Sequence, residues 1–190
     1  MSDLFVDNIK HQSSQGSGTI TLGASGETIA LASGAQVSGF TGQNYPAFEA
    51  TLSTSQSVSD ETLTKVQFNT EVLDTNGYYD NVTNYRFTPL VAGKYFVYLN
   101  ILTFAGNNSD LNGIIASIGK NGSEYRRGQF SFLSNPIRFA PAVVSCIVDM
   151  NGSTDYLEGS GLVNAADDTG SQIYSSGTDL SFFGAYRIGA

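Results

Sequence analysis

The chain has 190 residues, of which 14% are charged, and its formal net charge at pH 7 is −8. Its only adjacent basic pair is Arg126 and Arg127, so the clustered lysines and arginines of a nucleic-acid-binding face are missing. No stretch approaches the roughly 20 apolar residues of a membrane span, and no apolar export signal follows Met1. We therefore expect synthesis in a cytoplasm, no nucleic-acid partner and no membrane insertion.

Residues 1–35 differ in character from the rest of the chain and predict an N-terminal arm. A short apolar group opens the arm, a Gly/Ser-rich stretch follows, and two alternating apolar segments then repeat at a spacing of nine residues. Two such short strands cannot bury their apolar side alone, so we expect contacts with other chains, as in a three-chain β-prism. A flexible arm with chance alternation is the alternative. The predicted arm contacts are Leu4, Phe5, Val6, Ile9, Ile20, Leu22, Ile29 and Leu31.

Residues 36–45, with Gly39, Gly42 and Asn44, predict a linker. The remaining part, residues 46–190, alternates short apolar segments with turn residues and shows no helical periodicity. Strands are predicted at Ala47–Leu52, Leu63–Phe68, Tyr85–Phe87, Lys94–Leu102, Gly113–Lys120, Ser123–Phe132, Ala142–Val148, Asp155–Leu162 and Leu180–Ile188. Between two of them, the dipeptide at 121–122 (Asn-Gly) is a strong hairpin signal. This series predicts an all-β sandwich or jelly roll.

Two segments define the expected core of the head. In the first, Arg86–Pro89 ends one strand and starts a turn, and the next strand begins after Gly93, where the turn needs a positive φ. In the second, the apolar stretch Leu180–Ile188 stops two residues before the last one, which predicts a final strand inside a sheet. The residues assigned to the core and fold are Phe87, Pro89, Gly93, Tyr95, Phe182, Phe183 and Gly184.

Five motifs of residues 46–190 resemble, in order, the globular head of the complement C-one-q and tumour-necrosis-factor families. They are Ala47–Ala50, Val66–Asp80, Arg86–Val97, Ile118–Gly122 and Phe182–Tyr186. The segment Val148–Leu157 matches the family pattern more loosely, and no collagen-like Gly-X-Y stalk precedes the head. The resemblance implies an antiparallel jelly-roll sandwich and a tight homotrimer with an apolar, aromatic-rich axis.

The layout of the whole chain is similar to that of small structural proteins of marine tailed phages. In those proteins a leader of the type found here at Asp7–Lys10 and Gly16–Leu22 precedes such a head. This resemblance implies a role on a virion, with residues 1–35 binding other virion proteins.

No cluster of residues predicts catalysis. The chain has one histidine, His11, in the predicted arm, and one cysteine, Cys146, in an apolar strand. Neither an activated nucleophile nor a zinc site is therefore expected. The stretch Asp74–Asp80 has a faint calcium-loop pattern without the closing glutamate, and a turn built on its Asp, Asn and Gly residues is favoured. We expect no enzyme activity, no cofactor and no metal.

A tyrosine-rich rim that contacts a host glycan or protein is a further hypothesis, because tyrosine combines an apolar ring with a polar tip. Half-buried packing within the sandwich is the favoured alternative for the same side chains. The residues concerned are Tyr78, Tyr79, Tyr85 and Tyr125.

The predicted function is that of a non-enzymatic structural protein on the exterior of a phage virion. In this reading a homotrimeric knob either decorates the capsid, as a decoration protein or head fibre, or belongs to a tail fibre that contacts the host surface. The alternative is a ligand-binding jelly-roll module of a cellular adhesion or signalling protein.

Overall fold

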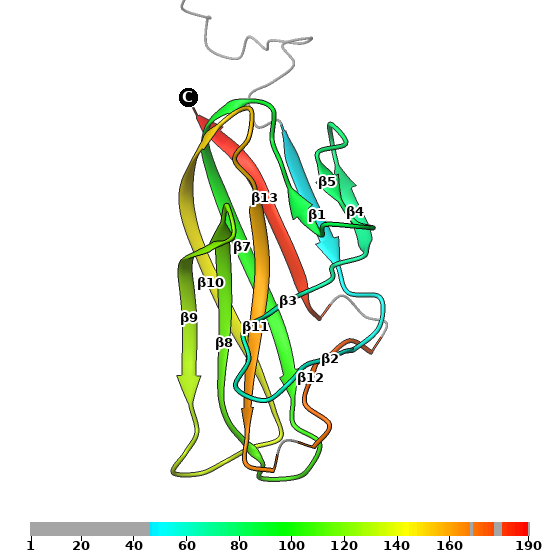
Figure 1. Ribbon diagram of the computed structural model, residues 1–190, viewed down its shortest axis with the longest axis vertical. Helices are drawn as coiled ribbons and strands as arrows, with labels where there is room; N and C mark the ends of the chain where they lie inside the picture. Colours follow the sequence, from blue (N-terminus) through cyan, green and yellow to red (C-terminus); the bar gives the residue numbers. More distant parts are fainter. Residues whose placement is uncertain (1–45, 168, 177–179, 190) are drawn as a thin grey trace, which may run out of the picture. The chain divides into compact units, whose positions relative to one another are not determined.

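The computed structural model describes residues 46–167, 169–176 and 180–189 (Figure 1). The predicted arm and linker, residues 1–45, lie outside the described residues, and with them the eight arm contacts and His11. The described part contains thirteen strands. Among its residues, no helix has the length and apolar character needed to cross a membrane.

The strands form two antiparallel sheets, here called sheet A and sheet B. Sheet A contains β1 (Ala47–Thr51), β2 (Gln56–Ser57), β4 (Thr70–Asp74), β7 (Ala92–Phe104), β10 (Phe139–Asn151), β12 (Gln172–Ile173) and β13 (Phe182–Gly189). Sheet B contains β3 (Thr64–Lys65), β5 (Tyr79–Asp80), β6 (Arg86–Phe87), β8 (Leu111–Lys120), β9 (Ser123–Ser131) and β11 (Leu157–Ala165). The all-β antiparallel jelly-roll prediction is thereby confirmed.

The strand orders place β9 and β10 at neighbouring edges of the sandwich. Sheet A runs β2-β12-β7-β13-β1-β4, with β10 paired to β7, and sheet B runs β5-β6-β11-β8-β9, with β3 paired to β11. The two longest strands, β7 and β10, pair along their whole length, from Ala92 opposite Asn151 to Phe104 opposite Phe139. Figure 1 shows the long strands running along the long axis of the described part.

Several short strands escaped sequence-based prediction. β4 has no alternation of buried and exposed residues, and β2, β5 and β12 have two residues each, too few for a periodic pattern. The predicted strand Leu63–Phe68 shrinks to β3. Beyond it the chain still follows the sheet, because the Val66 N–H donates to the Gly159 carbonyl, but the Gln67 N–H donates to a side chain, Oε1 of Gln56.

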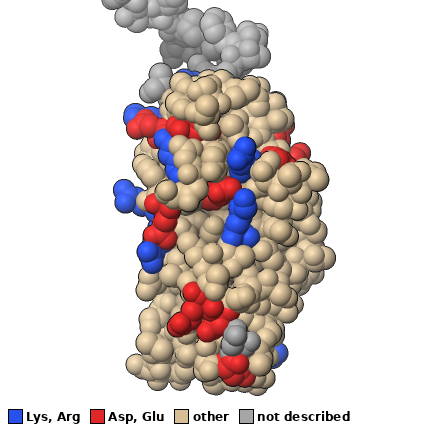
Figure 2. All heavy atoms as spheres, viewed as in Figure 1, with Lys and Arg blue, Asp and Glu red and all other residues tan. Residues whose placement is uncertain are grey.

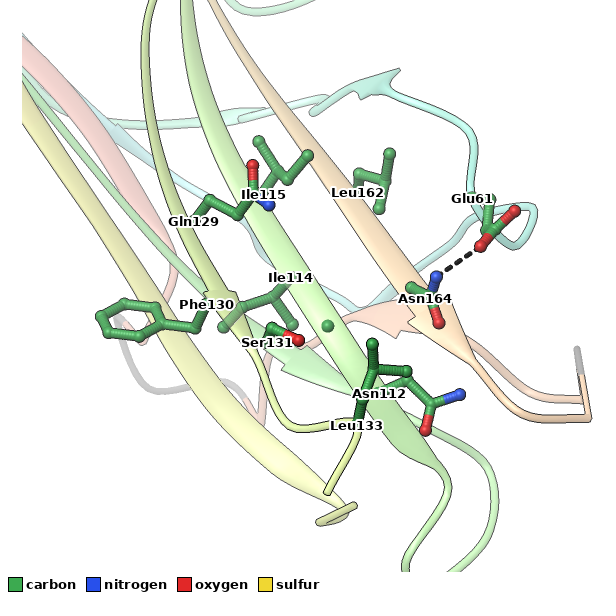
Figure 3. A pocket seen from close by; sticks show the side chains of 11 residues that line it. Glu61, Asn112, Ile114, Ile115, Gln129, Phe130, Ser131, Leu133, Leu162 and Asn164 are labelled. Carbon is green, nitrogen blue, oxygen red and sulfur yellow. Dashed lines mark hydrogen bonds between the residues drawn. The ribbon is translucent and has the colours of Figure 1, made fainter. Parts of the chain in front are cut away.

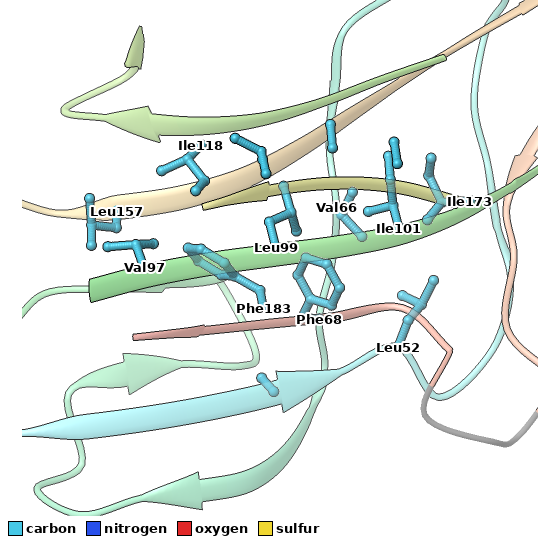
Figure 4. Close-up of a cluster of buried hydrophobic side chains, with 14 of the residues drawn as sticks. Leu52, Val66, Phe68, Val97, Leu99, Ile101, Ile118, Leu157, Ile173 and Phe183 are labelled. Carbon is cyan, nitrogen blue, oxygen red and sulfur yellow. The ribbon is translucent and has the colours of Figure 1, made fainter. Parts of the chain in front are cut away.

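An aromatic cluster fills the space between the sheets. Phe48 stacks on Phe87 with ring centroids 4.4 Å apart and meets Phe183 edge-on at 5.1 Å, while Phe68 lies 5.9 Å from Phe183. Figure 4 shows Phe68 and Phe183 side by side near Leu99. Each fully buried large side chain contributes about 1.5–3 kcal/mol before the entropy of ordering is counted. The core therefore depends on rings from four separate segments.

Two glycines of β11 make room for this cluster. A Cβ atom at Gly159 would lie 3.0 Å from the Phe68 ring and 3.1 Å from Leu99, and one at Gly161 would lie 2.7 Å from Ile101. Because these positions face the core, larger residues would displace the side chains of sheet A. The glycines of β11 therefore leave the space that the large side chains of β7 occupy.

Positive φ angles occur at both of the turns for which the sequence predicts them. At the predicted hairpin between β8 and β9, Asn121 and Gly122 have φ angles of 54° and 77°, as a type I′ turn requires. Gly93 has φ 143°, and a Cβ there would approach the Gly189 carbonyl oxygen to 2.3 Å. Only glycine fits this second position without moving the end of β13.

The residues assigned to the core divide into two groups. Phe87, Tyr95 and Phe183 are fully buried, and Pro89 is buried as well. Phe182 is not part of the core. Because neighbouring residues of a strand point to opposite faces, Phe182 lies half-buried on the outer side of sheet A, next to Tyr98.

Candidate self-association face

The outer side of sheet A carries an unusual concentration of large apolar side chains. Successive residues of β7, β10 and β13 alternate between the core and this outer side. We call the outward set the aromatic face. Its members are Phe96, Tyr98, Phe104, Phe139, Val143, Ile147, Phe182, Tyr186 and Ile188.

The register of the strands brings these side chains into rows across the sheet. Phe96 lies opposite both Ile147 of β10 and Tyr186 of β13. The rings of Phe96 and Tyr186 are 5.6 Å apart, and at the other end Phe104 lies 4.8 Å from Phe139. Cross-strand contacts of this kind hold aromatic rings in place on a sheet surface.

The aromatic face remains open in the single chain. Val143 is 58% exposed and Ile147 54% exposed, both on the edge strand β10. No charged residue occurs between Phe96 and Phe104 of β7, or between Phe139 and Ile147 of β10. A face rich in exposed aliphatic and aromatic side chains is typical of a surface that another protein covers.

Tyr98 is fixed at the centre of the aromatic face. Its hydroxyl donates to Oε2 of Glu49 on β1 at 2.7 Å. Its ring lies directly over Gly184, where a Cβ atom would come within 2.3 Å of the Tyr98 hydroxyl oxygen. Burial, and then the hydrogen bond to Glu49, raise the pKa of Tyr98. Gly184 therefore has a structural role: it lets a ring cross β13.

The free edge of sheet A is partly closed by β9. The Tyr125 hydroxyl donates to the Ile147 carbonyl at 3.3 Å. Gly128 approaches Val143 so closely that a Cβ atom would lie 2.3 Å from the Val143 carbonyl oxygen. This approach joins the aromatic face to the exposed edge of sheet B.

The four tyrosines of the rim hypothesis do not form one site. Tyr79 is buried, and its hydroxyl donates to the Phe68 carbonyl at 2.9 Å, which excludes it from any rim. Tyr125 is 40% exposed but lies on β9, at the opposite edge of sheet B from β5 and β6. Tyr78 and Tyr85 are half-buried near that second edge. The four tyrosines were grouped because they are the same type of residue, but the tertiary structure places them at different sites.

The acidic stretch Asp74–Asp80 is built as two turns. The Asp74 carboxylate accepts the backbone N–H groups of Asn76, Gly77 and Tyr79. The Asp80 carboxylate accepts those of residues 82–84, and these bonds hold its pKa at about 2. In the part of the chain that the structure describes, no three His, Cys, Asp or Glu side chains are grouped to hold a metal ion.

A buried carboxyl group lies where β8 begins. Oδ1 of Asp110 accepts the N–H groups of Ala166 and Asp167 at 2.9 and 3.1 Å. Its Oδ2 atom is buried, and no donor among the described residues reaches it. Burial, and then the neighbouring Asp167 side chain, raise the pKa of Asp110. Hydrogen bonds from Thr169 hold the pKa of Asp167 at about 2.

The fold resembles that of tumour-necrosis-factor ligands. Eiger TNF from S. frugiperda matches with a TM-score of 0.54 and 12% sequence identity, over 74% of this chain and 90% of that one. Murine APRIL, in its crystal structure at pH 8.0, matches with a TM-score of 0.52 and 13% identity, over 74% and 97%. No protein-family model and no curated protein matches the sequence. The chain therefore has the tumour-necrosis-factor-like jelly-roll fold.

Sequence reasoning did not single out most of the aromatic face, although the signal was present. A strand with one side in solvent alternates polar and apolar residues, whereas Lys94–Leu102 is apolar at nearly every position. Such a strand predicts burial on both sides. The core covers one side of β7, and the second side belongs to the aromatic face, which is open in the single chain.

Proposed function

We propose that this protein is a non-enzymatic structural protein of a phage virion surface, and that three copies associate through the aromatic face. In this proposal residues 46–190 form an exposed knob, and residues 1–35 attach it to other virion proteins. The virion exterior is its place of action after synthesis in the host cytoplasm. The knob belongs to a capsid decoration, a head fibre or a tail fibre in contact with the host surface.

The observation that carries self-association is the aromatic face itself. Its exposed residues lie on a sheet, and the one carboxylate described at its centre, that of Glu49, already accepts a hydrogen bond from Tyr98. Burying apolar area contributes about 25 cal/mol per Å², and stable obligate interfaces typically exceed about 2,000 Å². The resemblance of the sequence to the complement C-one-q and tumour-necrosis-factor heads favours three copies over two.

The test of self-association is the mass of the purified protein in solution. Light scattering should give three times the 20.2 kDa mass of one chain. Ile147→Lys places a charge on the aromatic face and should prevent the trimer from forming. Val82→Lys is the matched control, because Val82 is 73% exposed and lies outside the aromatic face. A stable monomer of the natural chain at micromolar concentration would contradict the proposal.

The virion role is tested separately. Antibodies against the head should label phage particles, and the position of the label would distinguish capsid from tail. A variant lacking residues 1–35 should fail to bind particles that lack this protein, because the arm is proposed to supply attachment and three arms act together through their effective concentration. Decoration by the truncated variant at natural occupancy would place the attachment surface on the jelly roll.

A cellular adhesion or signalling module is the second candidate. The structural likeness to Eiger TNF and murine APRIL supports the jelly-roll fold, which this candidate shares with the first. A trimer is expected in both cases, so self-association does not separate them. Labelling of particles does: cell-surface label without particle label would support the second candidate.

A further inference from the structure

A groove of about 380 Å³ crosses the outer side of sheet B, on the opposite layer from the aromatic face. Its apolar walls come from Ile115 of β8, Leu162 of β11 and Leu133 of the segment after β9. In Figure 3 these side chains surround the hollow, and the Phe130 ring points away from it. The volume falls within the range of small-molecule sites, about 300–1,000 Å³.

Gly113 opens the floor of this groove. It belongs to β8, and β11 and β9 flank it with Asn164 and Ser131 as its cross-strand partners. A Cβ atom at Gly113 would lie 3.3 Å from the Phe130 carbonyl oxygen and 3.8 Å from the Asn164 Cβ. Any larger side chain would fill the space between the walls.

One end of the groove contains a strained residue. Glu61 has φ 51°, a value that costs free energy in a residue other than glycine. Two contacts hold it there: its N–H donates to the Val163 carbonyl at 2.9 Å, and its Oε1 accepts from Nδ2 of Asn164. The fold therefore fixes a carboxylate and an amide side by side at the groove, in a conformation that the loop alone would not favour.

The other polar side chains of the groove make no hydrogen bonds within the described part of the chain. Asn112, Gln129 and Ser131 line it, and none of their side chains hydrogen-bonds to any described residue. An amide offers both donors and an acceptor, and a hydroxyl offers one donor and two lone pairs. Figure 3 shows the amides of Asn112 and Gln129 at the margin of the hollow, where a ligand could reach them.

The charge of the groove restricts the ligand. Its lining has one carboxylate, from Glu61, and no Lys, Arg or His. Figure 2 shows no Lys or Arg in the lower left of the view, whereas a group of Asp and Glu atoms lies in its lower half. A phosphate, a sulfate or an acidic sugar would find no cation here and would be repelled by Glu61.

From these observations we infer that the sheet-B groove binds one residue of a neutral saccharide. The C–H groups of a sugar ring are apolar and can pack against Ile115 and Leu162. Its hydroxyl groups can form hydrogen bonds with the amide and carboxylate side chains of the groove. The inference rests on the proposed function only for the source of the saccharide, a glycan of the host surface. Sugar binding itself requires neither the trimer nor the virion.

The test uses the full chain and defined sugars. Methyl glycosides of glucose, galactose and N-acetylglucosamine are titrated by saturation-transfer NMR and calorimetry, with N-acetylneuraminic acid as the acidic comparison. At least one neutral glycoside should bind with a dissociation constant of about 1 mM, and the acid at least tenfold more weakly. Gln129→Ala and Asn112→Ala should each weaken binding at least fivefold with little change in melting temperature, because neither amide has a partner in the fold.

Gln67→Ala is the matched control: Gln67 is exposed, and its side chain lies outside the groove. Three results would overturn the inference. They are no binding of any neutral glycoside at 10 mM or below by either method, tighter binding of N-acetylneuraminic acid, and equal losses in Gln129→Ala and Gln67→Ala. Each can occur in a protein that is trimeric and labels virions, so the inference can fail while the proposed function holds.

Discussion

The two outer sides of the sandwich differ sharply although they enclose the same core. The aromatic face of sheet A exposes rings and aliphatic chains, and the carboxylate at its centre, that of Glu49, is hydrogen-bonded to Tyr98. The outer side of sheet B carries the ion pair of Lys65 with Glu158 at 2.8 Å, whereas on the outer side of sheet A an ion pair, Lys94 with Asp149, occurs at one end of β7 and β10. Figure 2 shows most of the visible Lys and Arg atoms in the upper part of the view, and Asp and Glu atoms in both its upper and lower parts.

The different residues on the two outer sides indicate which outer side, that of sheet A or that of sheet B, faces water. Strands with one solvated side alternate polar and apolar residues, and on the outer side of β11 Glu158, Ser160 and Asn164 are polar while Leu162 is apolar. β7 has Phe96, Tyr98 and Phe104 at the equivalent positions. Both strands fill the core equally well, so core packing does not explain the outer residues of β7. The proposed association of several copies through the aromatic face would explain them.

The largest effect should come from the core that both sides share. Phe183→Ala removes a fully buried ring that contacts Phe48 and Phe68. We expect it to lower the free energy of unfolding by about 3–5 kcal/mol, because it leaves a cavity between the sheets. Chemical denaturation with two probes measures the change. Phe182→Ala is the control, and a cost as large as that of Phe183→Ala would contradict the assignment of Phe182 to the outer side.

A smaller effect is expected at the centre of the aromatic face. Tyr98→Phe keeps the ring over Gly184 but removes the hydroxyl that donates to Glu49. Hydrogen bonds to charged groups contribute about 1.5–3 kcal/mol, and we expect a loss within that range. Denaturation at pH 7 measures it, and Tyr186→Phe serves as the control on the same face. No loss at all would show that the Tyr98–Glu49 bond is open in solution.

Asp110→Asn should stabilise the protein. Because the pKa of Asp110 is raised in the fold, the folded state holds its proton more tightly than the unfolded chain. Its contribution to stability is therefore favourable below the ordinary value of about 3.9 and is lost as the pH rises through the raised value. Asparagine carries no charge, and its amide supplies a donor where Oδ2 has none.

We expect a gain of about 1 kcal/mol for Asp110→Asn at pH 7, within the range for one unsatisfied buried acceptor. For a domain of this size that corresponds to a rise in melting temperature of about 2–4 °C. The gain should shrink toward pH 4. Asp149→Asn, an equal change of charge at an exposed site, is the control. A gain that is the same at pH 4 and pH 7 would refute the role of Asp110 ionisation.

The smallest effect should come from the charged side of the molecule. Lys65→Ala removes the ion pair with Glu158, which is partly open to solvent. Exposed ion pairs contribute about 0–1 kcal/mol, and we expect a loss below 1 kcal/mol and an unchanged oligomer. Scattering and denaturation on the same sample measure both. If Lys65→Ala caused the trimer to dissociate, the association surface would have to lie on sheet B and not on the aromatic face.

The fold class could be predicted because its signals are local. The turn at Asn121 and Gly122, the glycine before Lys94 and the apolar strands each depend on a few neighbouring residues. Short strands such as β2 and β12 could not be predicted, because two residues form a ladder only where a neighbouring strand is already in place.

The sequence by itself determined that this chain is an all-β sandwich without helices in its head, and it placed Phe87, Tyr95 and Phe183 inside. Tertiary structure alone decided which strands share a side. It separated Tyr79 from Tyr125, turned Phe182 outward, and brought Glu61 next to Asn164, which lies 103 positions away. The physical reason is that alternation along a strand tells which residues point the same way, whereas the pairing of distant strands decides what they meet.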